Sequence, residues 1–311
     1  MHFTGTIWRP PYEAASLLLE VTAGCTHHSC KFCTLYDDLP FPFRMSPLAD
    51  VEADLLEAQT LAHSPLERLS AALQGLPAGR TYDRAFLTGA NPFVLKAERL
   101  LEIAQLVGRY FPSVQSIGCF ARITDVGLKT DGELEQLRAA GYDGITIGVE
   151  TGDPQALAFM DKGYAPADVL EQGRRLDRAG IGYHFFYLAG ISGAGRGREG
   201  ARASAELFNQ LRPRIIGSSM LTVYPNSRLY REIQAGNWAQ AGELEKLDEV
   251  RELISRLTIP VTFAALGASN AYHFQGRLPE DRAGLLAGLD RVCRAADEEE
   301  LRQYRDTLPH L

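Results

Sequence analysis

The stretch Leu17-Leu-Leu-Glu-Val-Thr-Ala-Gly-Cys25-Thr-His-His-Ser-Cys30-Lys-Phe-Cys33 runs from a β-rich apolar segment directly into three cysteines. We predict that Leu17–Thr22 is the first strand of a sheet and that the cysteines lie on the loop after it. Three thiols in one loop can bind a metal or cluster at low conformational cost, whereas free thiols grouped this closely are open to oxidation. The stretch therefore predicts a metal or cluster site at the end of the first strand.

Around this stretch, short β-rich runs alternate with longer helical stretches. The predicted strands are Leu17–Thr22, Ala85–Thr88, Val114–Phe120, Gly144–Val149, Gly182–Ala189, Ile215–Val223 and Val261–Ala265. The predicted helices are one that opens at Ser46-Pro47 and reaches Ala62, then Lys96–Tyr110, Asp131–Ala140, Pro154–Met160, Pro166–Ala179, Gly200–Leu211, Ala241–Leu257 and a tail over Pro279–Thr307. Ser64–Tyr82, with its prolines and glycines, is expected to be a partly helical insertion.

Strands that alternate with helices of this length form right-handed βαβ units and a parallel sheet. We therefore expect an α/β fold, a partial or full parallel (βα) barrel of about six units with a short C-terminal helical extension. Residues 1–240 are expected to form the barrel core, and residues 241–311 a strand and helix extension that closes it. In such barrels the chemistry lies at the carboxyl ends of the strands.

Composition limits the class of protein. The chain has 311 residues, 23% of them charged, and a formal net charge of −7. An acidic chain lacks the basic footprint that nucleic-acid binding needs, so we expect no nucleic-acid partner. No signal peptide is evident and no apolar run is long enough to cross a bilayer, so we expect a cytoplasmic protein without a membrane partner. In that compartment the five cysteines favour metal binding or catalysis over disulfides.

The residue pattern leaves the kind of metal open among three alternatives. A zinc ion would need a fourth ligand, for which His27 or His28 is available. A [2Fe–2S] cluster with this cysteine spacing would need Cys119 or Cys293 as its fourth ligand. A [4Fe–4S] cluster bound by three cysteines would leave one iron open to an exogenous ligand, as a catalytic zinc keeps one open position.

The cysteine loop, its place after strand one and the aromatic Phe32 before the last cysteine resemble the radical S-adenosylmethionine (radical SAM) superfamily. The spacing Cys-x4-Cys-x2-Cys has one residue more in its first gap than the commonest form of that family's motif. The stretch Ala268-Ser-Asn270 is similar to one in a stand-alone, uncharacterised branch of the family. The resemblance implies that Cys25, Cys30 and Cys33 bind a [4Fe–4S] cluster, with S-adenosylmethionine as the second cofactor.

Positions further along the chain match the same family in order. The turn after strand two would bind the methionyl amine, the acidic residue at the end of strand four would bind the ribose hydroxyls, and the glycine after strand five would pack on the adenine. An arginine shortly after the cysteine loop could pair with the cofactor carboxylate, and a serine assigned to the end of strand three could face the cofactor. The expected cofactor-binding residues are Phe32, Arg44, Thr88, Gly89, Ala90, Asn91, Ser116, Glu150 and Gly190.

The resemblance implies an enzyme that reductively cleaves S-adenosylmethionine and abstracts hydrogen from a substrate, which we expect to be a small molecule. A flavodoxin- or ferredoxin-like protein would supply the electron. With no second cysteine cluster and few residues before Cys25, we expect neither auxiliary clusters nor cobalamin. The alternative function is a zinc- or [2Fe–2S]-binding structural or electron-transfer protein.

Overall fold

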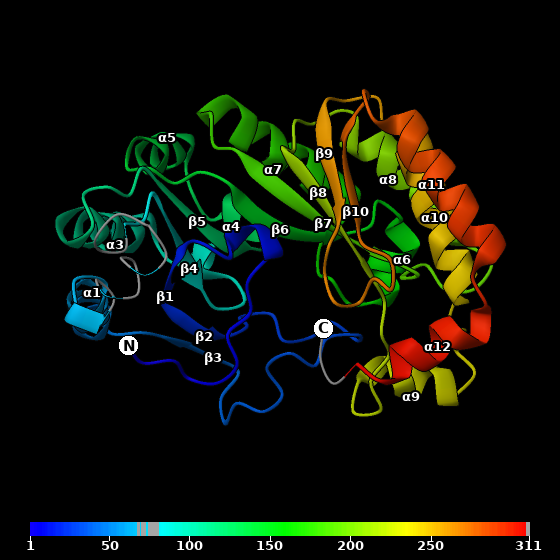
Figure 1. Cartoon of the computed structure of the whole chain (residues 1–311), viewed down its shortest axis with the longest axis horizontal. Helices are drawn as coiled ribbons and strands as arrows, with labels where there is room; N and C mark the ends of the chain where they lie inside the picture. The colour runs from blue at the N-terminus through cyan, green and yellow to red at the C-terminus, as the bar shows by residue number, and fades with distance from the viewer. Residues whose placement is uncertain (67–68, 70–72, 74–80, 309–311) are drawn as a thin grey trace.

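The architecture comes from a computed structural model, which describes residues 1–66, 69, 73 and 81–308. Most of the insertion expected over Ser64–Tyr82 lies outside these described residues. In the described part, one mixed sheet carries helices along its length (Figure 1).

The sheet has eight strands in the order β1-β4-β5-β6-β7-β8-β9-β10. All neighbouring pairs from β1 to β9 are parallel, and β10 runs antiparallel to β9. The strands are β1 (Leu17–Glu20), β4 (Arg84–Thr88), β5 (Ser116–Ala121), β6 (Ile145–Glu150), β7 (Tyr183–Ala189), β8 (Ile215–Met220), β9 (Val261–Ala265) and β10 (Phe274–Leu278). Since β1 and β10 are its two edges, the sheet is a partial barrel, which confirms the predicted fold class.

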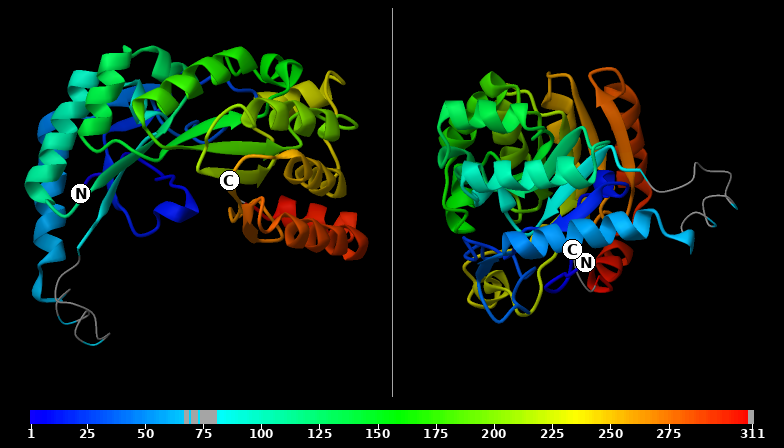
Figure 2. Two further views of the ribbon diagram at one scale, coloured as in Figure 1. Left: turned by 90° about the horizontal axis from the view of Figure 1, so that it is seen from above. Right: turned by 90° about the vertical axis from the view of Figure 1, so that its left-hand side faces the viewer.

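Helices follow the strands and cover one side of the sheet. Seen from above, the sheet bends into an arch with most of its helices on the outer, convex side (Figure 2). The helices are α1 (Leu48–Ala62), α3 (Ala97–Tyr110), α4 (Ile123–Gly127), α5 (Asp131–Ala139), α6 (Pro154–Phe159), α7 (Pro166–Ala179), α8 (Gly197–Phe208), α9 (Arg228–Gln234), α10 (Glu243–Arg256), α11 (Arg282–Ala295) and α12 (Glu298–Asp306), with the 3₁₀ turns η1 (Pro11–Glu13) and η2 (Pro92–Val94).

Side-chain alternation along each strand separates the two faces of the sheet. On β4, Ala85 and Leu87 belong to the main apolar core beneath the helices, so Phe86 and Thr88 point to the opposite face. There Phe86 and Phe120 meet edge to face with their ring centroids 5.2 Å apart, and Phe186 continues the group 6.3 Å from Phe120. The inner face of the arch is therefore aromatic at mid-depth.

The amino end of the sheet is filled by the chain's own N-terminal segment. Glu13 on η1 is buried and pairs with Arg84 at 2.7 Å. Tyr12 lies beside His184, with the ring centroids 4.9 Å apart, and its hydroxyl is 2.9 Å from that of Thr146. This plug leaves the carboxyl ends of the strands as the place for a site.

The structure differs from the predicted elements at a few places. The first predicted strand divides into β1 and β2 (Thr22–Gly24), because Thr22–Gly24 pairs with the short β3 (Phe43–Met45) instead of with β4. The tail is not helical throughout: it breaks before Asp297, whose carboxylate accepts hydrogen bonds from the backbone N–H groups of Glu299 and Glu300 and so starts α12 anew. Strands β3 and β10 and helices α4 and α9 were not predicted.

The two-part division at residue 240 stays a prediction. Strand β9, beyond that boundary, pairs with β8 and continues the same sheet. Within the described residues, no helix has the length and apolar character that a membrane crossing requires.

Candidate active site

The three cysteines lie in the loop of a small hairpin at the carboxyl end of the sheet. Strands β2 and β3 form the base of this hairpin, with Ala23 opposite Arg44, and the backbone N–H of Cys25 donates to Pro42 O at 2.7 Å. In Figure 1 the loop below β2 and β3 lies at the same end of the molecule as α9 and α12. We call residues 25–42 the cysteine loop.

The thiols of the cysteine loop are free and partly buried. The backbone N–H of Cys33 donates to Cys30 O at 3.2 Å, so the last two cysteines flank one tight turn. Burial is the main cause that raises the pKa of the Cys33 thiol to about 12, with smaller contributions from the neighbouring Cys30 and Cys25. Phe32 is buried in an apolar cluster against which Cys30 and Cys33 pack.

The donor set fits an iron–sulfur cluster, because three thiolates from one loop with apolar surroundings are the ligands such clusters use. Among the described residues, no group of three His, Cys, Asp or Glu side chains is arranged so that it could hold a metal ion. Lys162 lies nearby, with its Nζ 5.5 Å from the centroid of the Phe32 ring. Burial raises the pKa of the Cys30 thiol, and the charge of Lys162 partly offsets that rise.

The turn after β4 approaches the cysteine loop closely. Gly89 has φ +125°, and a Cβ added there would lie 2.0 Å from Thr22 Oγ1, so only glycine fits. The backbone N–H of Ala90 donates to Gly24 O at 3.4 Å. Thr88 is buried, and its hydroxyl has no hydrogen-bond partner among the described residues. The turn is thus placed as predicted, beside the loop.

Asn91 uses its side chain within the protein. It is fully buried. Its amide Nδ2 donates to Thr26 Oγ1 at 2.8 Å and to both carboxylate oxygens of Asp125, and its Oδ1 accepts from the backbone N–H of Thr26. This clasp fixes the residue next to Cys25. Contact between Asn91 and the cofactor stays a prediction.

Glu150 stands at the carboxyl end of β6, as predicted. Its backbone has φ +67°, a conformation that costs about 1–2 kcal/mol for a residue with a Cβ. Its carboxylate accepts a hydrogen bond from Lys162 Nζ at 3.1 Å. Burial of Lys162 would lower the pKa of its ammonium, but Glu150 outweighs burial and raises it. A charged pair is therefore held beside the cysteine loop.

Gly190, after β7, also occupies a position that requires glycine. Its φ is +91°, and an added Cβ would lie 2.9 Å from Lys246 Cε. Its backbone N–H donates to Glu249 Oε2 at 2.9 Å. Burial raises the pKa of the Glu249 carboxyl to about 8. The turn that was expected to pack on the adenine thus rests on α10.

Two predicted site residues are placed differently from the expectation. Ser116 begins β5 instead of ending it, and its hydroxyl accepts from Arg84 NH1 at the plugged amino end, so the prediction that it faces the cofactor is wrong. Arg44 lies exposed on β3, where it donates to Thr4 Oγ1 at 2.8 Å and stacks over Phe41 at 4.9 Å. A role for Arg44 toward the cofactor carboxylate stays a prediction.

Sequence reasoning missed a clamp between the cysteine loop and α9. Arg228 NH1 donates to Ser29 O and its NH2 to Asp161, each at 2.9 Å. His27 Nε2 lies 2.5 Å from Asp161 O. The non-glycine residues with positive φ in the described chain are His28, Glu150 and Asp161, all at this site. Strain of this kind concentrates at functional sites, but a sequence does not display it.

These features define the class: a parallel partial barrel with a cysteine loop, a glycine turn and an acidic strand end at one face. The family model of the radical SAM superfamily matches residues 19–193. The chain belongs to that superfamily. The predicted class, a radical S-adenosylmethionine enzyme whose family cofactors are a [4Fe–4S] cluster and S-adenosylmethionine, is confirmed.

Solved structures of this superfamily share the fold. Coproporphyrinogen III oxidase (HemN) from Escherichia coli has a TM-score of 0.57 and 18% identity, over 78% of this chain and 52% of that one. Methylornithine synthase (PylB) has a TM-score of 0.52 and 13% identity, over 93% of this chain and 85% of that one. The methyltransferase TsrM from Kitasatospora setae has a TM-score of 0.51 and 20% identity, over 71% of this chain and 39% of that one. This chain spans about half or less of the first and third of these proteins. No curated protein matches the sequence.

Proposed function

We propose that the chain binds a [4Fe–4S] cluster through Cys25, Cys30 and Cys33 and cleaves S-adenosylmethionine reductively to take hydrogen from a small-molecule substrate. The observation that carries this proposal is the place of the cysteine loop, at the carboxyl ends of the parallel strands in a chain of this family. When bound, the cluster would supply one electron for cleavage of the cofactor's C5′–S bond and leave one iron for its amine and carboxylate.

The chain's own residues would bind and orient the cofactor along the carboxyl ends of the strands. The close backbone approach at Gly89 and Ala90 offers main-chain groups to an ammonium, with the Thr88 hydroxyl, unpartnered among the described residues, beside it. Glu150 would accept hydrogen bonds from two ribose hydroxyls while Lys162 holds its charge in place. Gly190 would offer a flat surface to the adenine, and Phe32 would cover the thiols from water.

A flavodoxin- or ferredoxin-like donor and a cytoplasmic location complete the proposal. The alternative, a zinc or [2Fe–2S] structural or electron-transfer protein, has less support. For zinc, His27 Nε2 lies 2.5 Å from Asp161 O and His28 Nε2 lies 3.5 Å from Asp37 Oδ1, so both rings have partners within the protein. For a [2Fe–2S] cluster, neither of the two remaining cysteines joins the loop. Cys119 is buried under the sheet in the main core, and Cys293 lies on α11.

The test is anaerobic reconstitution of the full chain with iron and sulfide. We expect about four irons per chain and release of 5′-deoxyadenosine when dithionite is added with S-adenosylmethionine. Cys30→Ala should lose both the cluster absorbance and the product, whereas Cys293→Ala, outside the loop, should keep them. Zinc without sulfide, or product formation by Cys30→Ala, would refute the proposal.

A further inference from the structure

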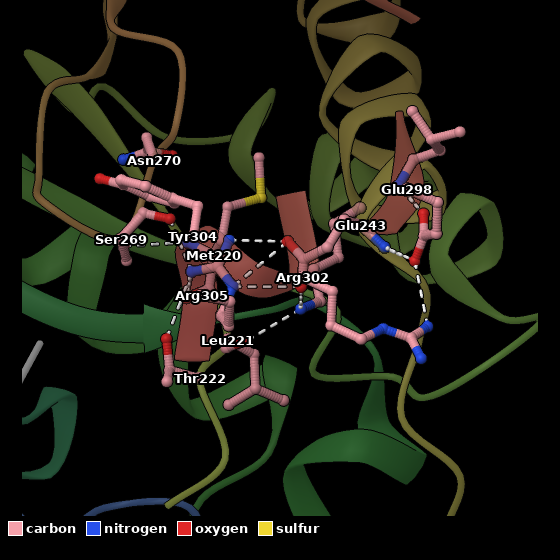
Figure 3. A network of polar contacts seen from close by, with 12 residues as sticks. Met220, Leu221, Thr222, Glu243, Ser269, Asn270, Glu298, Arg302, Tyr304 and Arg305 are labelled. Carbon is pink, nitrogen blue, oxygen red and sulfur yellow. Dashed lines mark hydrogen bonds and ion pairs between the residues drawn. The ribbon is translucent and has the colours of Figure 1, made fainter. Parts of the chain in front are cut away.

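A buried ionic network joins the C-terminal helix to the end of β8. Arg305 of α12 is 4% exposed and donates to both carboxylate oxygens of Glu243, to Oε1 at 3.1 Å and to Oε2 at 2.7 Å. Figure 3 shows its guanidinium between Glu243 on one side and Ser269 and Thr222 on the other. Arg305 sits only a few residues from the end of the chain, yet it lies among the carboxyl ends of the strands.

The same guanidinium donates to backbone and hydroxyl oxygens at and just beyond the end of β8 and in the loop after β9. Its NH1 donates to Ser269 O at 2.6 Å, to Thr222 Oγ1 at 3.2 Å and to Met220 O at 3.4 Å. These oxygens belong to Met220, the last residue of β8, to Thr222, two residues later, and to Ser269 in the loop after β9. A planar fork with five N–H donors can make this set of bonds, whereas the single ammonium of lysine cannot.

A second cation of the network holds the next residue. Lys246 of α10 is fully buried, and its Nζ donates to Leu221 O at 2.9 Å and to Glu243 Oε1 at 2.6 Å. Burial alone would raise the pKa of the Glu243 carboxyl, but Arg305 and Lys246 outweigh it and keep that pKa low. Burial lowers the pKa of the Lys246 ammonium, and the charge of Glu243 opposes that shift. Glu243 therefore lies between two basic side chains that it binds directly.

Leu221 connects this network to the cysteine loop. Its side chain is buried in the apolar cluster that contains Phe32, and Cys30 and Cys33 pack against the same cluster. Its backbone N–H donates to Ala189 O at 2.9 Å, beside the turn at Gly190. A shift of the backbone at Leu221 would thus reach both the apolar packing around the thiols and the neighbouring turn.

We propose that Arg305 is a positioning residue for the cysteine loop: with Glu243 and Lys246 it fixes the backbone after β8, and Leu221 passes that placement to Phe32, Cys30 and Cys33. The C-terminal helix is then a working part of the site and not only a cover for the sheet. The effect on the cluster rests on the proposed function. The packing of Leu221 against the cysteine loop does not, because it is present in the metal-free chain.

The experiment compares Arg305→Lys and Leu221→Ala with wild type and with Gln303→Ala. Gln303 lies on the same helix but is exposed, and its side chain donates to Glu299, outside the network, so its variant controls for a general effect on α12. Leu221→Ala removes the apolar contact with the Phe32 cluster and leaves Arg305, Glu243 and Lys246 unchanged. It tests the same inference if Arg305→Lys does not fold. Thermal unfolding of each variant measures the structural cost separately.

The first readout is the alkylation rate of each cysteine in the metal-free full chain, followed by mass spectrometry. We expect Arg305→Lys and Leu221→Ala to raise the rates at Cys30 and Cys33 at least threefold, while Cys293 reacts as in wild type and Gln303→Ala leaves all the rates unchanged. Unchanged rates at Cys30 and Cys33 in both variants would overturn the inference, whatever the melting temperatures.

The second readout is the reconstituted protein. We expect both variants to shift the electron paramagnetic resonance signal of the reduced cluster and to lose cluster absorbance in air several times faster than wild type. Wild-type signal and lifetime in both variants would overturn the inference and leave the proposed function intact. Faster alkylation of a chain that takes up no iron would support the positioning role and refute the proposed function.

Discussion

The site is held from two sides by different chemistry. On the β4 side a single neutral amide, Asn91, clasps Thr26 and Asp125 next to Cys25. On the β8 side three charged side chains from α10 and α12 hold the backbone around Leu221, which packs in the cluster with Phe32. The first arrangement acts directly on the cysteine loop, and the second acts through a strand end and an apolar cluster. Removing a side chain from the direct contact should therefore lower the free energy of unfolding more. Removing one from the indirect network should change the placement of the cysteine loop more than it changes stability.

The largest effect is expected for Asn91→Leu. The substitution leaves the buried Asp125 without its amide donor and removes both bonds to Thr26, so the free energy of unfolding should fall by about 3–4 kcal/mol. Urea unfolding measures it. Asn226→Leu is the matched control, because Asn226 is exposed and reaches Asp37 at 3.4 Å; a loss as large there would show that removing any such amide suffices.

The turns at Gly89, after β4, and at Gly190, after β7, allow the same comparison through the stability cost of adding a Cβ to the backbone. In Gly89→Ala the new Cβ meets the hydroxyl and, at 2.5 Å, the carbonyl oxygen of Thr22, which cannot move away, so we expect a loss of about 3 kcal/mol. In Gly190→Ala it meets the flexible stem of Lys246, and about 1–2 kcal/mol should be lost. Gly180→Ala, with φ +69° and open space around it, measures backbone strain alone. Equal losses at Gly89 and Gly180 would contradict the comparison.

The stability of the chain as a function of pH tests how Glu249 of α10 supports the turn at Gly190. Burial raises the pKa of Glu249 from 4.5 to about 8, so the folded chain keeps a proton that the unfolded chain has released between these values. This carboxyl therefore lowers stability as pH rises through that window, by at most about 1.4 kcal/mol per unit. Glu249→Gln should remove that dependence, so the stability difference between variant and wild type should grow in the variant's favour from pH 5 to pH 8. A constant difference would place the titration elsewhere.

The smallest effect is expected for Arg44→Ala. The side chain is exposed, and its bond to Thr4 and stacking on Phe41 should contribute about 0.5 kcal/mol or less. Titration calorimetry of the reconstituted protein with S-adenosylhomocysteine then measures whether Arg44 contributes to the affinity for the cofactor. A tenfold weaker affinity with unchanged stability would establish Arg44 as a partner of the cofactor carboxylate, and an unchanged affinity would remove it from the site.

The sequence allowed good predictions where the local backbone requires a particular residue type. The glycines after β4 and β7, Glu150 at the end of β6 and the three cysteines after the first strand lie at the positions in the fold that were predicted for them. Ser116 was misplaced because the strand predicted from Val114 begins two residues later; the period of two gives the face of a strand but not its ends.

Long-range partners gave no local signal. Arg305 stands in a charged helical tail, where an arginine is typical of a solvated face, and only the fold brings it against Glu243 and the end of β8. Asn91 was correctly placed but its side chain was expected to face the cofactor, because nothing near it in the sequence reveals Thr26 and Asp125 as neighbours. The positive φ of Glu150 and Asp161 also has no residue-type signature.

The small β2–β3 hairpin has a consequence for how the cysteine motif can vary in length. Because the ladder of Thr22 to Met45 and Gly24 to Phe43 closes the loop at its base, an extra residue between Cys25 and Cys30 changes only the path inside that loop. The pairing of β1 with β4 lies outside this loop, and His28, with its positive φ, lies within the longer first gap of the motif. An insertion in the metal-binding motif is thus insulated from the barrel.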